Sequence, residues 1–403
     1  MLETALRPAR VSWRISHGAG FWIIAAAFAA ALAFSTVPTP LYVLYQQRDG
    51  FPTYVVTIVF AAYAVGVMAS LYLAGHVSDW LGRRRVILVA TLAEVLSAAL
   101  FLVWPEVPGL VLARLVGGAG IGALTATATA HLSELRAVAH PREDHGRAGL
   151  AATVVNMGGL ALGPLAGGVF ASYSAEPLRT PFVFFLVLLV VLAIAVALVP
   201  ETVERAEERP AYRPQRVALP AGARSAFSGA AIGAFAAFAI TGLSMALTPT
   251  LLAQGLHENS RLLAGFASFA VFAAAASAQV VFAGLNTKSQ LRLGLVLMVT
   301  GLVALPVAVT TSVLWLFFAG GIAAGAGAGL NIRASVATAA ALAEPPSRGE
   351  VLAALFLAAY AGLVLPILLV GIALVWLPSS WALLGFSVLE LALLTWAAPR
   401  ALR

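Results

Sequence analysis

A succession of long apolar runs, separated by short polar stretches, is the feature that most constrains the fold of this 403-residue chain. A helix needs about 20 residues to cross the hydrocarbon of a bilayer, and most of the runs reach that length. Inside lipid, a helix satisfies its own backbone hydrogen bonds. The sequence therefore predicts an all-α membrane protein with twelve spans, at residues 21–44, 54–74, 86–104, 109–130, 149–171, 182–199, 227–252, 262–283, 291–309, 313–337, 351–376 and 380–396.

Composition excludes several other classes of protein. Only 10% of the residues are charged and 61% are hydrophobic, whereas a soluble domain carries about 25% charged residues. The net charge of +7 does not indicate a nucleic-acid partner, because the arginines lie mainly in short stretches on one side of the spans. The absence of cysteine excludes disulfides and thiolate metal sites. We expect neither a metal nor a cofactor.

The distribution of basic residues predicts the orientation. Nineteen lysines and arginines fall on one side of the predicted spans, against three on the other, Arg48, Arg179 and Arg261. Basic residues concentrate on the cytoplasmic side, so both termini are expected in the cytoplasm. The first run is longer than a signal sequence and is expected to be retained as a span. Richness in alanine and a preference for arginine over lysine suggest the inner cell membrane of a bacterium. The histidines fall in loops or at span ends and are expected to be mostly solvated, at His17, His76, His131, His140, His145 and His257.

The two parts of the chain repeat one another. An offset of 209 residues carries Ser35 and Pro40 of the first span onto Ser244 and Pro249 of the seventh. Such repeats are expected of transporters whose site lies between two halves, and the prolines suit a bend in these spans. The longest polar connection, rich in Glu, Arg and Pro, is expected to be a cytoplasmic linker. The predicted division is an N-terminal six-helix bundle at 1–199, the linker at 200–225 and a C-terminal six-helix bundle at 226–403.

The turn between the second and third spans carries an ordered set of small and charged residues. Its glycines permit a tight turn, and Asp79 can accept hydrogen bonds at a helix start or from the guanidinium of Arg83. A basic loop that only fixes topology is the simpler interpretation. The pattern resembles motif A of the major facilitator superfamily, except that Trp80 stands where that family usually has a basic residue. The stretch reads Gly75-His76-Val77-Ser78-Asp79-Trp80-Leu81-Gly82-Arg83-Arg84-Arg85.

This resemblance implies that the turn helps to close the cytoplasmic side of a transporter. Asp79 would contact the start of the eleventh helix near Glu350 and Val351, where the helix dipole favours a negative charge. Arg83 would brace Asp79, and the ring of Trp80 would sit at headgroup level. The gate residues that the resemblance implies are Gly75, Asp79, Gly82, Arg83 and Arg84.

The fourth span contains an arginine, Arg114, followed by a glycine-rich stretch. A charge within a span is costly and usually faces protein or water, although an arginine can also snorkel to the surface. The glycines permit close packing of helices. The stretch resembles motif B of the superfamily, and the resemblance implies a role for Arg114 in proton coupling. It reads Arg114-Leu115-Val116-Gly117-Gly118-Ala119-Gly120-Ile121-Gly122.

The fifth span carries glycines at intervals of four residues, which share one helix face and allow a neighbouring helix to approach. Pro164 removes a backbone hydrogen bond and can kink the helix. Simple packing is one interpretation. The set also resembles motif C, which is typical of drug:proton antiporters of the same superfamily, and therefore favours export over uptake. Its members are Gly159, Gly163, Pro164, Gly167 and Gly168.

Two acids lie within spans, Glu94 and Glu390. Each is a candidate for proton binding, because a charged carboxylate is costly inside the bilayer. Glu94 lies at a depth close to that of Arg114, and we predict that the two groups pair; a local hydrogen bond of Glu94 is the alternative. The substrate cavity is expected to be neutral and to suit amphipathic molecules, although its members could equally be packing residues. The candidates are Thr36, Tyr63, Asn156, Met157, Ser244, Met245, Gln279, Asn331 and Tyr360.

The three motifs lie in order along essentially the whole chain. The resemblance implies the major facilitator fold, with twelve transmembrane helices in two pseudo-symmetric six-helix bundles. It also implies a monomeric secondary transporter that exports a small amphipathic molecule in exchange for protons by alternating access. A proton-driven importer of a metabolite is the nearest alternative, and a non-transporting membrane sensor is another. We do not expect an enzyme, because the sequence has no His-Glu-x-x-His or Gly-x-Ser-x-Gly motif.

Overall fold

The computed structural model describes residues 15–74, 78–141, 145–203, 223–344 and 347–402. Within these ranges every regular element is a helix, and twelve helical segments are long and apolar enough to cross a membrane, which confirms the predicted spans. The elements are α1 His17–Thr36, η1 Thr39–Leu41, α2 Tyr42–Asp49, α3 Thr53–Ala74, α4 Ser78–Leu81, α5 Arg83–Val103, α6 Val107–Ala139, α7 His145–Tyr173, α8 Thr180–Leu198, α9 Arg224–Gly255, α10 Arg261–Val281, α11 Thr287–Thr311, α12 Leu314–Leu342, α13 Arg348–Ala373 and α14 Ser379–Ala401.

Local sequence sets where several of these helices begin and end. The side chains of Ser16, Ser260 and Asn286 each accept a hydrogen bond from a backbone N–H in the first turn of α1, α10 and α11. Gly50 ends α2 with a φ of 71°, a left-handed conformation that glycine adopts without strain. The predicted bend in the first span occurs at Pro38 and Pro40, where α1 gives way to the short helix η1 and then to α2.

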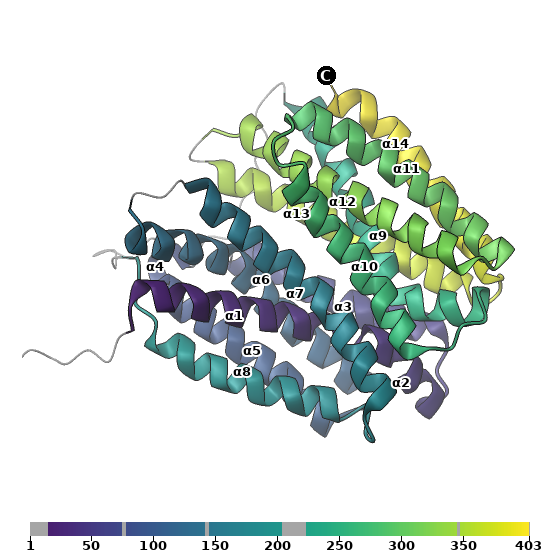
Figure 1. Ribbon diagram of the computed structural model, residues 1–403, viewed down its shortest axis with the longest axis horizontal. Coiled ribbons are helices and arrows are strands. Elements are labelled where there is room, and N and C mark those ends of the chain that lie inside the picture. The colour runs from purple at the N-terminus through teal and green to yellow at the C-terminus, as the bar shows by residue number, and fades with distance from the viewer. Residues whose placement is uncertain (1–14, 75–77, 142–144, 204–222, 345–346, 403) are drawn as a thin grey trace, which may run out of the picture.

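The helices form two bundles that lie side by side, with the first half coloured purple to teal and the second green to yellow in Figure 1. In the first half α3 and α5 pack on α6, and α1 packs on α7. In the second half α9 packs on α13 and α14, and α12 packs on α10 and α11. The halves meet where α3 packs on α13 and α7 packs on α10, and we call this boundary the seam.

Glycines bring the two halves together at one end of the seam. A Cβ atom at Gly168 of α7 would lie 3.0 Å from the carbonyl oxygen of Arg261 and 3.2 Å from the Cα of Gly265 on α10. Gly371 of α13 packs against the side chain of Thr57 on α3. Both contacts lie at the end away from α4. We call the α4 end the basic end, because Arg83, Arg84 and Arg85 begin the helix that follows α4.

Exposed tryptophans lie where helices leave the bundle. At the end opposite the basic end, Trp315 near the start of α12 and Trp376 just after α13 are 72% and 75% exposed. At the basic end, Trp22 in the second turn of α1 is 70% exposed. Tryptophan rings favour the headgroup region of a membrane. These positions therefore fit a bilayer that surrounds the helices between the two ends.

Candidate functional site

Arg114 of α6 is buried next to the seam, with 3% of its surface exposed, and so it does not snorkel to the membrane surface. Its guanidinium carbon lies 4.4 Å from the ring centroid of Tyr63 and 5.9 Å from that of Phe60, both on α3. One guanidinium N–H donates to the backbone carbonyl of Ser35 on α1. Ring faces attract a cation when water is excluded, and these contacts partly replace the solvation that Arg114 has lost.

Glu94 of α5 is also fully buried, and it packs on the glycine face of α6. Cβ atoms at Gly117 and Gly120 would lie 3.3 Å and 2.7 Å from its two carboxyl oxygens. Neither oxygen has a hydrogen-bond partner among the described residues. A buried carboxylate without a partner is costly, so this geometry suits the protonated acid.

The predicted ion pair between Glu94 and Arg114 is not formed within the described part of the chain. Arg114 turns towards α1 and α3, whereas Glu94 lies one to two helical turns further along α6, against Gly117 and Gly120. The absence of side chains at these glycines leaves the space that the carboxyl group occupies. Three to six residues correspond to about 5–9 Å along a helix axis, which keeps the two groups near each other without direct contact.

Two of the predicted cavity residues lie with Arg114 at the seam. Tyr63 is 4% exposed and faces the guanidinium of Arg114. Tyr360 of α13 packs against the apolar cores of both halves and meets Phe238 of α9 edge to face, with ring centroids 5.1 Å apart. The guanidinium of Arg114 therefore lies against two rings of the first bundle, and a further pair of rings, from α9 and α13, lies in the second bundle at the seam. We call Phe60, Tyr63, Arg114, Phe238 and Tyr360 the seam cluster.

The glycines of α7 form the predicted close-packed face. A Cβ atom at Gly159 would lie 2.8 Å from the carbonyl oxygen of Ala29, and Cβ atoms at Gly163 and Gly167 would lie closer still to the backbone of the first span. Gly168 faces α10 instead. Pro164 lies inside α7, and its carbonyl oxygen contacts Gly265 of α10. This stretch therefore joins α7 to α1 within one bundle and to α10 across the seam.

At the basic end, the start of the linker folds back onto α5. The carboxylate of Glu201 accepts hydrogen bonds from the backbone N–H groups of Arg83 (2.9 Å) and Arg84 (3.2 Å), and so caps α5. The guanidinium of Arg83 donates to the Ser78 hydroxyl (2.6 Å) and to Glu134 of α6 (3.3 Å). Gly75 and the side chain of Asp79 lie outside the described residues, and so does the predicted contact of Asp79 with Glu350.

A second set of polar contacts surrounds His131 of α6. Its Nδ1 atom lies 2.9 Å from the hydroxyl of Thr202, which donates to the carboxylate of Glu134. His131 is fully buried and is an exception to the expectation that most of the histidines are solvated. The linker covers it, which the sequence does not show because its partner lies 71 residues away. Glu134, Glu201 and Thr202 were not predicted from the sequence. Their one local signal is that Glu134 follows His131 by three residues on a helix.

Comparison with known proteins establishes the family. A model of the Major Facilitator Superfamily matches residues 23–288 of the chain. The protein belongs to the major facilitator superfamily. The crystal structure of the human organic anion transporter MFSD10 (TETRAN) is similar, with a TM-score of 0.70 and 17% sequence identity over 95% of this chain and 100% of that one. At this identity the likeness shows the fold alone. The comparison with curated proteins gives no match.

In this superfamily transporter, several predicted cavity residues pack between helices of one bundle. The hydroxyl of Thr36 donates to the carbonyl of Leu160 at 3.1 Å, which links the first span to α7. The side chain of Asn331 is fully buried between the sulfur of Met298 and the hydroxyl of Ser335. No described contact joins Asn156, Met157 or Gln279 to the seam cluster. For these three residues, and for Thr36 and Asn331, a role in substrate binding remains a prediction.

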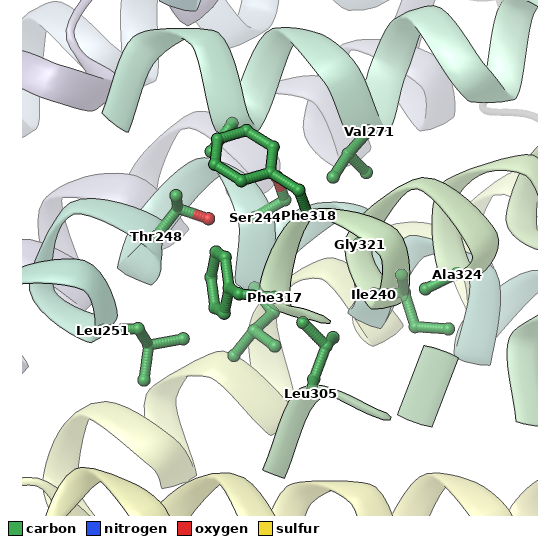
Figure 2. A pocket seen from close by; sticks show the side chains of 12 residues that line it. Ile240, Ser244, Thr248, Leu251, Val271, Leu305, Phe317, Phe318, Gly321 and Ala324 are labelled. Atoms are coloured by element: carbon green, nitrogen blue, oxygen red, sulfur yellow. The ribbon is translucent and has the colours of Figure 1, made fainter. Parts of the chain in front are cut away.

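Ser244 lines a cavity inside the second bundle of the transporter, between α9, α10, α11 and α12, beside Met245, which is buried in the core of the same bundle. Figure 2 shows Thr248 and Phe317 pointing into the same space. The cavity holds about 30 Å³, enough for a water molecule and far below the ~300 Å³ of a small-molecule site. The hydroxyl of Ser244 has no hydrogen-bond partner among the described residues, so a water molecule is the ligand that this space fits.

Glu390, the other acid within a span, lies apart from the seam cluster. It is fully buried on α14, which packs on α9 and α11, and its oxygens have no hydrogen-bond partner in the described ranges. Among the described residues, each bundle thus holds one buried acid without a hydrogen-bond partner. Only Glu94 packs on the helix that carries Arg114.

Proposed function

We propose that this transporter exports a small amphipathic molecule in exchange for protons by alternating access. The observation that carries the proposal is the arrangement of Arg114 and Glu94 on adjoining helices: a buried cation held by ring faces and a carbonyl, and a buried acid one to two turns away. Both groups lie in the bundle whose helices α3 and α7 form the seam.

The proton would act by changing the partner of Arg114. With Glu94 protonated, the guanidinium stays on the Ser35 carbonyl and the ring of Tyr63, as it does here. Loss of the proton creates a carboxylate that attracts the guanidinium of Arg114, which begins one to two helical turns away along α6. Movement of Arg114 towards Glu94 would release α1 and α3, and α3 contacts the other half through α13. Proton release is thereby linked to the packing of the seam.

The described conformation supports alternating access. The halves touch through Gly168, Gly265 and Gly371 at the end opposite the basic end. At the basic end of α3, Tyr72 and Leu73 are 43% and 48% exposed. With the basic end in the cytoplasm, as the distribution of arginines predicts, this conformation is closed to the outside. In the opposite conformation the turn that contains Arg83 and Arg84 would close the cytoplasmic end.

The charge of Arg114 favours one class of substrate within this proposal. Among the described residues it has no carboxylate partner, and a ligand with an acidic group would supply one. The similar fold of MFSD10, described as an organic anion transporter, points in the same direction. We therefore give amphipathic organic anions as the first class to test and neutral amphipathic molecules as the second. The glycine set of α7 supports export, and import of a metabolite on the same fold is the alternative.

Proton movement in inside-out vesicles with an established pH gradient tests the proposal. A panel of organic anions, lipophilic cations, neutral antibiotics and sugars is added, and one compound is expected to collapse the gradient with the wild type but not with Arg114→Ala. The matched control is Arg333→Ala, which removes another arginine within a span, on α12 of the second bundle. If a compound instead accumulates in right-side-out cells under a proton gradient, the importer alternative is correct. Ligand binding without any flux would favour a sensor.

A further inference from the structure

A groove between α5 and α6 has no part in the proposed exchange. It encloses about 300 Å³ and is lined almost entirely by apolar and small side chains, among them Val89 and Ala93 of α5 and Ala119 and Gly120 of α6. Val89 is 67% exposed, and Ala119 is also exposed, so the groove opens on the outer surface of the bundle. A surface of this kind in a membrane protein faces lipid.

The groove ends at the basic end, beside a second pocket of about 200 Å³. The two spaces share Leu81 and Arg85, and the second is also lined by Trp80, Arg84 and Glu201. An apolar channel therefore continues into a polar space that contains two arginines and an indole ring.

Among its described residues the polar space contains two guanidinium groups and one carboxylate, that of Glu201, which leaves a net positive charge. The carboxylate of Glu201 accepts hydrogen bonds from the backbone N–H groups of Arg83, Arg84, Thr202 and Val203. The guanidinium of Arg84 donates to the carbonyls of Ala197 and Val199 at the end of α8, which carry no net charge. Neither Arg84 nor Arg85 forms an ion pair with a described residue. An anion would complement the two guanidinium groups.

We propose that these two spaces bind one anionic phospholipid, with its phosphate at Arg84 and Arg85 and one acyl chain in the groove. From Arg85 to Ala93 the groove follows eight residues of helix, about 12 Å, which approaches the ~15 Å hydrocarbon depth of one leaflet. Basic pockets beside membrane helices suit anionic headgroups, and an indole suits headgroup depth. This assigns a role to Trp80, which replaces a basic residue of the superfamily pattern.

The bound chain would also cover the buried acid of α5. Gly120 lines the groove, and a carboxyl oxygen of Glu94 lies 2.7 Å from the position of a Cβ atom at Gly120. An acyl chain in the groove therefore adds an apolar layer between Glu94 and the surrounding membrane, and it fastens α5 to α6.

Native mass spectrometry of the full-length protein in detergent tests this proposal, with phosphatidylglycerol or phosphatidylcholine of the same acyl chains titrated in. The wild type is expected to bind one phosphatidylglycerol more tightly than phosphatidylcholine. Each arginine near an anionic headgroup contributes about fivefold, so Arg84→Gln with Arg85→Gln should lower phosphatidylglycerol affinity about 25-fold and remove the preference. Ala119→Phe fills the exposed side of the groove and should weaken the binding of both lipids.

Arg292→Gln is the matched control, because it removes an exposed arginine near the start of α11 in the second half, outside the lining of both spaces. It should keep the full preference for phosphatidylglycerol. Equal binding of the two lipids by the wild type would overturn the proposal. So would an unchanged preference in the double arginine variant, or an unchanged affinity in Ala119→Phe when its unfolding temperature shows that the variant is folded.

Discussion

Two neighbouring glycines of α7 allow the packing of α7 on α1 to be measured. A Cβ atom at Gly159 would lie 2.8 Å from the carbonyl oxygen of Ala29 and 2.9 Å from the Cβ of Leu32. A Cβ atom at Gly158 would meet nothing within 4 Å. Alanine at either position gains the same helix propensity, about 1 kcal/mol relative to glycine. The difference between Gly159→Ala and Gly158→Ala therefore isolates the steric term.

That steric term is expected to be ~1–3 kcal/mol, the usual cost of inserting a methyl group into a well-packed interface. Gly158→Ala should be as stable as the wild type or up to about 1 kcal/mol more stable. Gly159→Ala should unfold several degrees below Gly158→Ala in detergent, followed by tryptophan fluorescence on heating. Equal midpoints for the two variants would refute the close packing of α7 on α1. Transport should fall in Gly159→Ala and not in Gly158→Ala.

Three further predictions concern charged groups. Glu94→Gln should fold with near wild-type stability, because a neutral side chain already suits its site, but it should lose proton movement coupled to substrate. If coupling survives in Glu94→Gln and is lost in Glu390→Gln, then Glu390 and not Glu94 is the proton-binding acid. Glu201→Gln should destabilise the protein by ~1 kcal/mol through the weakened cap of α5, whereas the exposed Glu258→Gln should have no measurable effect on thermal unfolding. Asp79→Asn should insert normally into the membrane yet turn over more slowly in vesicle transport assays, and a wild-type rate would argue against a gate at this turn.

The sequence determined the twelve spans because lipid leaves few alternatives: a run of about 20 apolar residues must form a helix, and the charges must lie between runs. The position of Arg114 in a span and the shared face of Gly159, Gly163 and Gly167 follow from the same helical geometry. The family could be recognised from such local patterns, and the comparison with the superfamily confirms it.

Only the tertiary structure decided which groups are partners. A helical period shows which side chains share a face, but not which neighbouring helix that face meets. Arg114 contacts Ser35 and Tyr63, because α1 and α3 place a carbonyl group and a ring face beside it. Glu94 instead occupies the space left by the missing side chains of Gly117 and Gly120.

At the basic end, the contacts that the sequence did not predict join residues that lie far apart in the chain. Glu201 caps a helix that begins 118 residues earlier, and Thr202 buries His131 from 71 residues away. No local pattern encodes such pairs, because they depend on how α8 returns beside α5. The sequence alone thus determined the spans and the residue types available for a site, whereas the packing of the helices decided which of them meet.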